Sequence, residues 1–358
     1  MKTDLNKIMA KFNIESDITS YGNGHINDTY LTDTPRYIIQ RINTAIFKNP
    51  DELMENIMNV TDFLRNKLIE NGEDPERGTL TVIKTADGKN YFRAKDGNCF
   101  RVYKFIENSK SIEDGKTYKN LYDAGASFGK FQNMLKDFPA DKLHETIPDF
   151  HNTPKRVGAL KAAVERDASG RAASVKKEID FALENAKFAD VVVKNIANGS
   201  IPLRVTHNDT KINNILFDSD TDEALCVIDL DTVMPGSMLY DFGDALRMGA
   251  STGAEDETDL TKVHFDTEAF KHFAEGYLSE TKDCLTKAEI DLLGFSAKLL
   301  TYECGIRFLT DFLDGDTYFR IHRENHNLDR ARNQFALVAE IAEKEEELKN
   351  IVKGILEK

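Results

Sequence analysis

Apolar residues recur every three or four positions in several long segments, a spacing that predicts amphipathic helices. The clearest segment begins at Asn49 or Pro50 and ends at Gly72. The apolar positions on its predicted face are Leu53, Ile57, Val60, Leu64 and Leu68. Further helical segments are predicted at 117–137, across most of 155–198, at 265–312 and at 326–356.

Shorter apolar runs bounded by glycine, asparagine and aspartate predict strands. Residues 18–42 are expected to form two strands around a tight loop at 21–27, with the second strand starting at Arg36. The other strand-forming stretches are 79–95 around the Asp87-Gly88 turn, 100–106 and 203–233. This order predicts an α+β fold with a small β-rich lobe at 1–107 and a larger, mainly helical lobe at 108–358.

Composition limits the kinds of partner. Apolar residues make up 41% of the 358 positions, enough for a sizeable core. The net charge of −14 repels nucleic acid and anionic membranes. The start of the chain has no apolar core of signal-peptide length, and no run of about 18 apolar residues occurs. The four cysteines have no metal-ligand spacing. We therefore expect a cytoplasmic protein that binds neither membranes nor nucleic acid.

The most informative chemistry lies in a loop between two apolar strands. Asp209 and Asn214 stand five residues apart in this loop, and Asp229 ends an apolar strand fifteen residues later. An Asp-x4-Asn loop followed by such an aspartate is typical of kinase-type phosphoryl transfer. One carboxylate orients or deprotonates the attacking hydroxyl, while an amide oxygen and a second carboxylate suit Mg²⁺.

Several segments, in order, resemble a known group of kinases. The loop resembles the H-x-D-x4-N loop of aminoglycoside phosphotransferases, choline kinases and homoserine kinases, and bacterial N-acetylhexosamine 1-kinases are more similar still. The segments that carry the resemblance are 21–27, 101–107, 202–211 and 228–238. It extends from about residue 18 to about residue 340 and implies a two-lobed, protein-kinase-like fold.

The resemblance also implies roles for individual residues. Asp209 would be the catalytic base or hydroxyl-orienting group, Asn214 and Asp229 would be magnesium ligands, and His207 would be structural. ATP would bind under the glycine loop at Gly22 and Gly24, with its adenine on the backbone of Phe105, Ile106 and Glu107. His25 is expected either to contact phosphate or sugar, or to brace this loop.

Other residues are candidates for the acceptor pocket. Thr232 follows Asp231 and is a candidate for pointing its hydroxyl at the acceptor; Asp231 itself fits a supporting role, a substrate contact or a strand-end cap. Arg307 lies four residues after Glu303 on an apolar helix, so the two form either a structural ion pair or part of a site in which Arg307 binds a sugar's oxygens. Tyr318 is a further candidate for the same pocket.

Two positions depart from the protein-kinase pattern. Gln40 stands on the strand where a phosphate-binding lysine is expected, so the charge must come from elsewhere, with Arg41 and magnesium as candidates. Strand alternation places Gln40 and Arg41 on opposite faces. The triplet that begins at Asp241 spells DFG but lies too far beyond Asn214 for the metal aspartate, so we expect Asp241 to brace the loop.

The motif thus predicts ATP- and Mg²⁺-dependent phosphoryl transfer to a hydroxyl, and the resemblance implies that this is the anomeric hydroxyl of an N-acetylhexosamine. One alternative keeps the reaction and changes the acceptor to an aminoglycoside, choline, homoserine or a hexose. The acidic run 255–259 would suit a cationic acceptor, or is simply solvated surface. The other alternative is a nucleotide-binding pseudokinase, which Gln40 leaves open.

Overall fold

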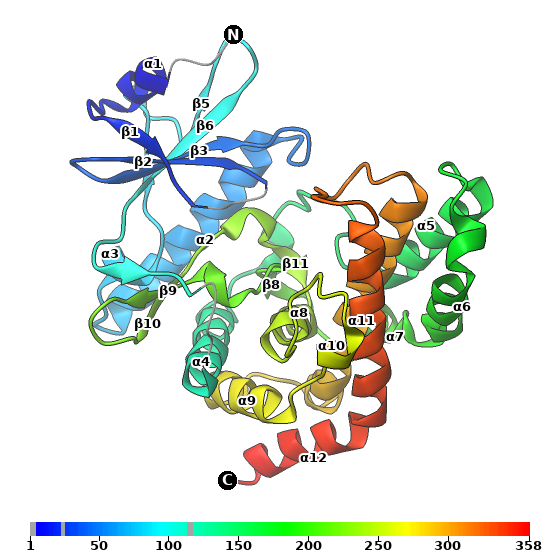
Figure 1. Cartoon of the computed structure of the whole chain (residues 1–358). Coiled ribbons are helices and arrows are strands. Elements are labelled where there is room, and N and C mark those ends of the chain that lie inside the picture. Colours follow the sequence, from blue (N-terminus) through cyan, green and yellow to red (C-terminus); the bar gives the residue numbers. More distant parts are fainter. Residues whose placement is uncertain (1–4, 23–25, 113–116) are drawn as a thin grey trace.

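An antiparallel sheet and one long helix form the amino-terminal lobe of the computed structural model, which describes residues 5–22, 26–112 and 117–358 (Figure 1). The sheet has the order β1-β2-β3-β6-β4, and β5 also pairs with β6. The strands are β1 (Ile18–Ser20), β2 (Asp28–Thr32), β3 (Tyr37–Ile42), β4 (Val82–Ile83), β5 (Phe92–Arg93) and β6 (Cys99–Lys104). The helices are α1 (Leu5–Met9), α2 (Pro50–Glu70) and α3 (Pro75–Gly78).

The second lobe is mainly helical, so the predicted two-lobed α+β architecture is confirmed. Its helices are α4 (Tyr118–Met134), α5 (Thr153–Arg166), α6 (Lys176–Asn185), α7 (Val191–Ala197), α8 (Met238–Gly249), α9 (Thr267–Thr281), α10 (Lys287–Leu313), α11 (His326–Glu343) and α12 (Glu345–Leu356). Its short strands are β7 (Ser109–Lys110), β8 (Arg204–Thr206), β9 (Ile215–Asp218), β10 (Ala224–Val227) and β11 (Met234–Gly236). They form the sheets β10-β9-β7 and β11-β8.

Two details of the strand prediction were wrong. Residues 18–42 form three strands, because Asp28–Thr32 makes an additional strand between the predicted pair. The turn around Asp87 and Gly88 is present, but the strands on its two sides do not pair with each other. Both β4 and β5 pair with β6 instead, because β6 offers them separate stretches along its length.

Helix α2 ties the lobes together. Asn49 caps its amino terminus, and all five of the predicted apolar positions are buried. This face belongs to a core that continues into the second lobe. On the same helix, the buried amide of Asn56 donates to the carbonyl oxygens of Val233, at 3.0 Å, and His144, at 2.8 Å. The helix therefore fixes the sheet relative to the segment that follows Asp229.

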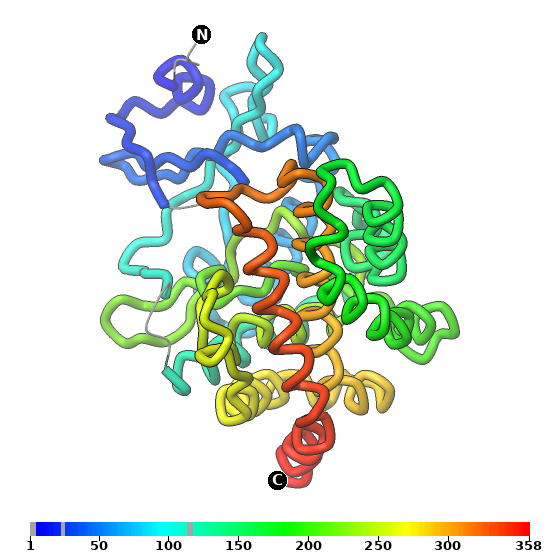
Figure 2. The backbone as a smooth tube through the Cα atoms, turned by 45° about the vertical axis from the view of Figure 1, so that its right-hand side comes forward, coloured from blue at the N-terminus to red at the C-terminus, as the bar shows by residue number. Residues whose placement is uncertain are grey.

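Glycines let the helices of the second lobe approach closely. Helices α4 and α9 cross where Gly125 and Gly276 face each other's backbones, and a Cβ on Gly276 would lie 2.0 Å from the carbonyl oxygen of Tyr122. Helix α10 is buried along most of its length. It is flanked by α8, α5 and α11, and Figure 2 shows the green segment of α5 and α6 beside the orange α10 and α11.

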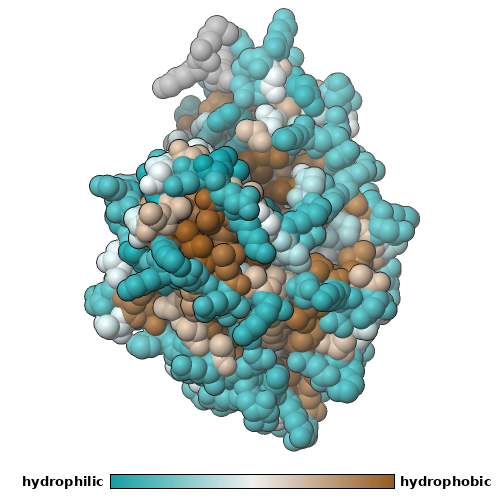
Figure 3. Space-filling view, turned by 90° about the vertical axis from the view of Figure 1, so that its right-hand side faces the viewer, coloured by the Kyte–Doolittle hydropathy of each residue, from teal (hydrophilic) through white to brown (hydrophobic). Residues whose placement is uncertain are grey.

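Polar residues cover most of the face shown in Figure 3, and the apolar residues there gather in recessed places. No helix among the described residues is long and apolar enough to span a bilayer.

Gly276→Ala tests the helix crossing. The added methyl group meets backbone that moves only with its helix, so we expect the variant to lose about 1–3 kcal/mol of unfolding free energy. Gly158→Ala in α5 is the matched control, because its Cβ meets nothing within 4 Å. There alanine should gain about 0.5–1 kcal/mol. Urea unfolding measures both, and equal stability of the two variants would contradict the described crossing.

Candidate functional site

The loop after β8 is held by one buried carboxylate. Asp241 accepts hydrogen bonds from the backbone N–H groups of His207, at 2.9 Å, and Asn208, at 2.7 Å. The amide of Gln132 on α4 also donates to it. Asn208 has a left-handed backbone with φ of 64°, a conformation that asparagine tolerates better than most residues. Asp241 therefore fixes the turn from which Asp209 emerges, as expected for this aspartate.

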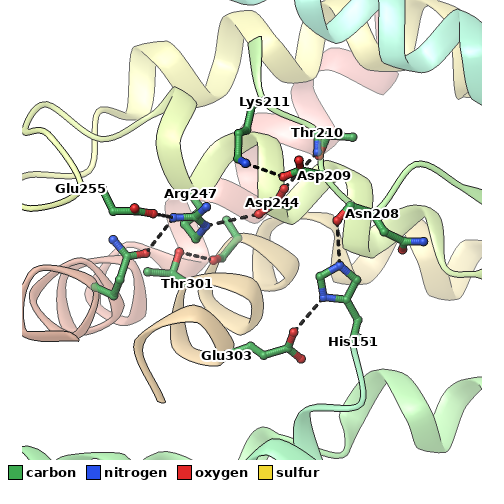
Figure 4. Close-up of polar contacts among 12 residues, drawn as sticks. His151, Asn208, Asp209, Thr210, Lys211, Asp244, Arg247, Glu255, Thr301 and Glu303 are labelled. Atoms are coloured by element: carbon green, nitrogen blue, oxygen red, sulfur yellow. Dashed lines mark hydrogen bonds and ion pairs between the residues drawn. The ribbon is translucent and has the colours of Figure 1, made fainter. Parts of the chain in front are cut away.

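Helix α8 supplies further contacts to the same loop. The hydroxyl of Thr210 donates to the carbonyl oxygen of Asp241 at 2.6 Å, and the Thr210 N–H donates to Asp244 at 3.0 Å (Figure 4). His207 is fully buried and interacts with the carbonyl oxygen of Ile228 at 2.8 Å. The loop is thus fastened on both sides of Asp209, with the predicted structural histidine inside it.

Asp209 is paired with a cation that the sequence analysis missed. The Lys211 ammonium lies 2.7 Å from Oδ1 of Asp209 (Figure 4). Asn214 donates from its amide nitrogen to the Asp209 carbonyl oxygen at 2.8 Å. Burial opposes ionisation of Asp209, but Lys211, His207 and Arg247 outweigh it and lower its pKa. Asp209 is therefore a carboxylate at neutral pH, placed beside Asn214 as their spacing predicted.

Asp229 has the opposite environment. It stands at the end of the β10 segment with a left-handed backbone, φ 60°. Among the described residues, none makes a hydrogen bond or ion pair with its carboxylate. The side chain remains accessible to solvent, but protein surrounds the carboxylate on several sides. Desolvation by this surrounding protein, together with the like charges of Asp231 and Asp209, raises the pKa of Asp229 to about 6. This carboxylate is therefore free to take a ligand that the described residues do not supply.

A buried histidine links the loop to α10. The His151 ring lies 2.8 Å from Glu303 and 3.2 Å from the carbonyl oxygen of Asn208 (Figure 4). Thr153 also donates to Glu303, at 2.6 Å. Glu303 and Arg307 do not form the ion pair considered from the sequence, because both oxygens of Glu303 have these partners. His151 was not among the predicted site residues, because no catalytic motif surrounds it in the sequence.

Arg307 points toward aromatic rings one helical turn beyond Glu303. Its guanidinium lies 5.5 Å from the ring centres of both Phe150 and Phe319, and no described residue offers it a hydrogen bond or ion pair. Arg156 lies nearby, with a buried Nε that has no partner. Burial, followed by the charge of Arg307, lowers the pKa of Arg156. Tyr318 is 60% exposed just beyond them.

The remaining predicted residues lie as follows. Thr232 is buried and donates its hydroxyl to the carbonyl oxygen of His207 at 2.7 Å, so its hydroxyl hydrogen is engaged with the loop. Gln40 faces Arg101 rather than open solvent. Gly22 has φ of 70° and open space around it, while Gly24 and His25 lie outside the described residues.

The segment 105–107 connects the sheet to the second lobe. Arg36 lies over the Phe105 ring and pairs with Glu107 at 2.9 Å. The carbonyl oxygen of Ile106 accepts from Ser109 at 2.6 Å. The predicted adenine contacts would thus lie on backbone that is fixed from both sides.

One cavity of about 1000 Å³ is remote from this chemistry. It lies in the first lobe between α2 and residues 86–93, and none of the predicted site residues lines it. A smaller cavity of about 150 Å³ lies behind the loop, between Lys211 and Phe128. Asp209 itself does not line this second cavity.

Comparison with known proteins agrees with this geometry. Residues 17–276 match the model of the family described as "Phosphotransferase enzyme family", abbreviated APH. A microcompartment-associated aminopropanol kinase has a similar structure, with a TM-score of 0.61 and 13% identity over 96% of this chain and 98% of that one.

Two further solved structures are similar. Amicoumacin kinase hAmiN, solved with AMP-PNP, Ca²⁺ and its ligand Ami, has a TM-score of 0.58 and 15% identity, covering 91% of this chain and 88% of that one. Choline kinase from Cryptosporidium parvum Iowa II has a TM-score of 0.56 and 14% identity, covering 95% and 91%. At such low identity these structures establish the fold alone.

Asp241→Asn tests how the loop is held. An asparagine has one acceptor oxygen where Asp241 serves two N–H groups, so we expect a loss of about 1–3 kcal/mol and faster hydrogen exchange at residues 207 and 208. Asp266→Asn is the control, because Asp266 caps α9, where asparagine caps equally well. Unchanged exchange at 207 and 208 in Asp241→Asn would show that the loop does not depend on this carboxylate.

Proposed function

The chain belongs to the APH phosphotransferase enzyme family, and from that premise we propose that it transfers the γ-phosphoryl group of ATP to the anomeric hydroxyl of an N-acetylhexosamine. The observation that carries the reaction is the arrangement of Asp209, Asn214 and the unpartnered Asp229 around one loop. The sugar is proposed from the similarity of four sequence segments to N-acetylhexosamine 1-kinases and from the charge of the acceptor region.

Asp209 orients the attacking hydroxyl in this proposal. Lys211 keeps Asp209 ionised, so Asp209 can accept a hydrogen bond from the hydroxyl of the acceptor. This bond would turn a lone pair of the hydroxyl oxygen toward the γ-phosphorus. Its lowered pKa makes it a weak base. That suits a loose transition state, in which little negative charge must be created on the attacking oxygen before the bond to phosphorus forms. The rate would come mainly from positioning.

Asp229 and Asn214 fit a magnesium ion. Mg²⁺ prefers oxygen ligands and usually retains several waters, so it needs few protein groups. When bound, the ion would neutralise phosphate charge. Desolvation by the surrounding protein and the like charges of Asp231 and Asp209 raise the pKa of Asp229, and a bound cation would offset that repulsion.

The acceptor region favours a neutral, oxygen-rich molecule. Burial, followed by the charge of Arg307, lowers the pKa of Arg156, and neither arginine forms an ion pair with a described carboxylate, so the two repel cationic acceptors. Guanidinium groups donate well to hydroxyl and amide oxygens. The rings of Phe150 and Phe319 add apolar surface, which suits the carbon face of a sugar.

The acidic run considered for a cationic acceptor is largely neutralised. Glu255 pairs with Arg247 at 2.6 Å, and Asp256 lies 3.7 Å from the Arg323 guanidinium. These partners occupy the carboxylates that an aminoglycoside would need. The acceptors named for the similar kinases, aminopropanol and choline, are cations at neutral pH, so this chain is proposed to differ from them in substrate.

The direct test is ADP release with Mg²⁺ and ATP against N-acetylglucosamine, N-acetylgalactosamine, galactose, kanamycin, choline and homoserine. Release is expected with the two acetylated sugars. Asp209→Asn should reduce kcat by a factor of about 10²–10⁴, since a positioned proton acceptor contributes that much. Tight ATP binding with no release in any reaction would favour the pseudokinase instead, and release with kanamycin or choline alone would reassign the acceptor.

Arg307→Met tests the acceptor pocket. Losing hydrogen bonds from a charged group should raise KM for the acetylated sugar about 10–100-fold, with KM for ATP unchanged. Arg171→Met is the matched control, because Arg171 also lies over a ring, that of Phe312, but is paired with Asp316 at 2.6 Å. It should leave both constants unchanged. Equal sugar KM values in wild type and Arg307→Met would remove Arg307 from the pocket.

A further inference from the structure

The cation missing from β3 stands on the neighbouring strand. Arg101 on β6 is the register partner of Gln40 and is 1% exposed. Its Nε and Nη2 donate to Oε1 of Gln40 at 3.0 and 2.8 Å. Gln40 in turn donates to Thr29 on β2 at 3.2 Å. Three strands of the sheet thus hold this guanidinium in one orientation.

The free end of Arg101 crosses to the other lobe. Its Nη1 lies 2.5 Å from Oδ1 of Asp231, which is also buried and stands two residues after Asp229. The second oxygen of Asp231 accepts from Asn27 at 2.7 Å. Asn27 follows the glycine loop, and its own side-chain oxygen accepts from the Asn43 N–H at 3.0 Å. The carboxylate of Asp231 therefore contacts two residues of the first lobe, Arg101 on β6 and Asn27 just before β2.

We propose that Arg101 and Asp231 form an interlobe clasp that positions Asn27 of the first lobe and Asp229 of the second relative to each other, as binding of magnesium-bound phosphates would require. Arg101 is buried, donates two hydrogen bonds to Gln40 and meets Asp231 as an ion pair through an Nη1 that makes no hydrogen bond, so it acts through Asp231 and not by touching phosphate. Both are positioning residues. The proposal rests on phosphoryl transfer from magnesium-ATP, but it is independent of which acceptor is used.

The surroundings explain why the pair must be intact. Arg101 packs 5.2 Å from the ring centre of Tyr103, and Arg101 and Asp231 are only 1% and 4% exposed. Removing either member strands a buried charge, whereas removing both leaves none. Stability and positioning therefore separate in a double variant.

The test compares Arg101→Met, Asp231→Asn and the double variant in the full-length protein. Each single variant should have a lower Tm and weaker binding of AMP-PNP with Mg²⁺. The double variant should recover most of the Tm but still bind the magnesium-loaded analogue at least about tenfold more weakly than wild type, a difference of about 1.4 kcal/mol. Its adenosine affinity should stay within about twofold. Calorimetric titration measures both affinities.

Arg204 and Glu289 provide the matched control. They form a buried pair at 2.9 Å inside the second lobe. Their double neutralisation, Arg204→Met with Glu289→Gln, should leave the affinity for the magnesium-loaded analogue as in wild type. The difference in affinity between the two double variants measures how much an ion pair that joins the two lobes contributes to binding of the magnesium-loaded analogue.

Two outcomes would overturn the clasp. One is wild-type affinity for magnesium-loaded AMP-PNP in the Arg101→Met, Asp231→Asn variant. The other is recovery of that affinity on adding Gln40→Lys to this variant, which would mean that only a charge facing the phosphates was missing. Because these readouts need no acceptor, failure to phosphorylate any sugar would count against the proposed function and leave this test intact.

Discussion

The carboxylate of Asp241 is the constraint on which the site depends. It receives two consecutive backbone N–H groups of a turn whose residue Asn208 has a left-handed backbone. Without an acceptor there, these buried donors would be unsatisfied and the turn would relax toward an ordinary conformation. Helix α8 carries Asp241, and its close contact with α10 at Gly243 fixes that helix in the core. The position of Asp209 thus depends on the packing of α8 against α10, which acts through Asp241.

The three aspartates near the loop differ in how the charge of their carboxylates is balanced. Asp209 is balanced by Lys211, Asp231 is neutralised by Arg101, and Asp229 has no described protein partner. Only the last is prepared to receive an added cation. A similar contrast appears around the proposed acceptor region, where Arg156 and Arg307 form no ion pair with a described carboxylate while Glu255 and Asp256 pair with arginines. A proposed preference for magnesium-nucleotide and a neutral acceptor follows from these imbalances.

The sequence was informative where function requires residues close together in the chain. The spacing of Asp209, Asn214 and Asp229 predicted their grouping, and the apolar period predicted the buried face of α2. It was uninformative where partners are far apart. Arg101 and Asp231 are separated by 130 positions, and an arginine between Phe100 and Val102 resembles any residue of a strand face. Its place in an otherwise apolar strand was the available signal.

Strand β2 and Arg156 were missed for related reasons. The β2 residues contain few apolar positions because the strand is only half-buried, so alternation was weak. Arg156 lies on a helix whose surface is rich in lysine and arginine, and only the fold brings it to Arg307.

The regiochemistry of the product tests the central claim most directly. N-acetylglucosamine labelled with ¹³C at position 1 would be incubated with the protein, ATP and Mg²⁺, and the product analysed by ³¹P and ¹³C NMR. The account predicts one phosphorylated sugar whose phosphorus couples to the labelled anomeric carbon. A phosphorylated product without that coupling would place the transferred group on another hydroxyl and contradict the proposed orientation of the sugar at Asp209.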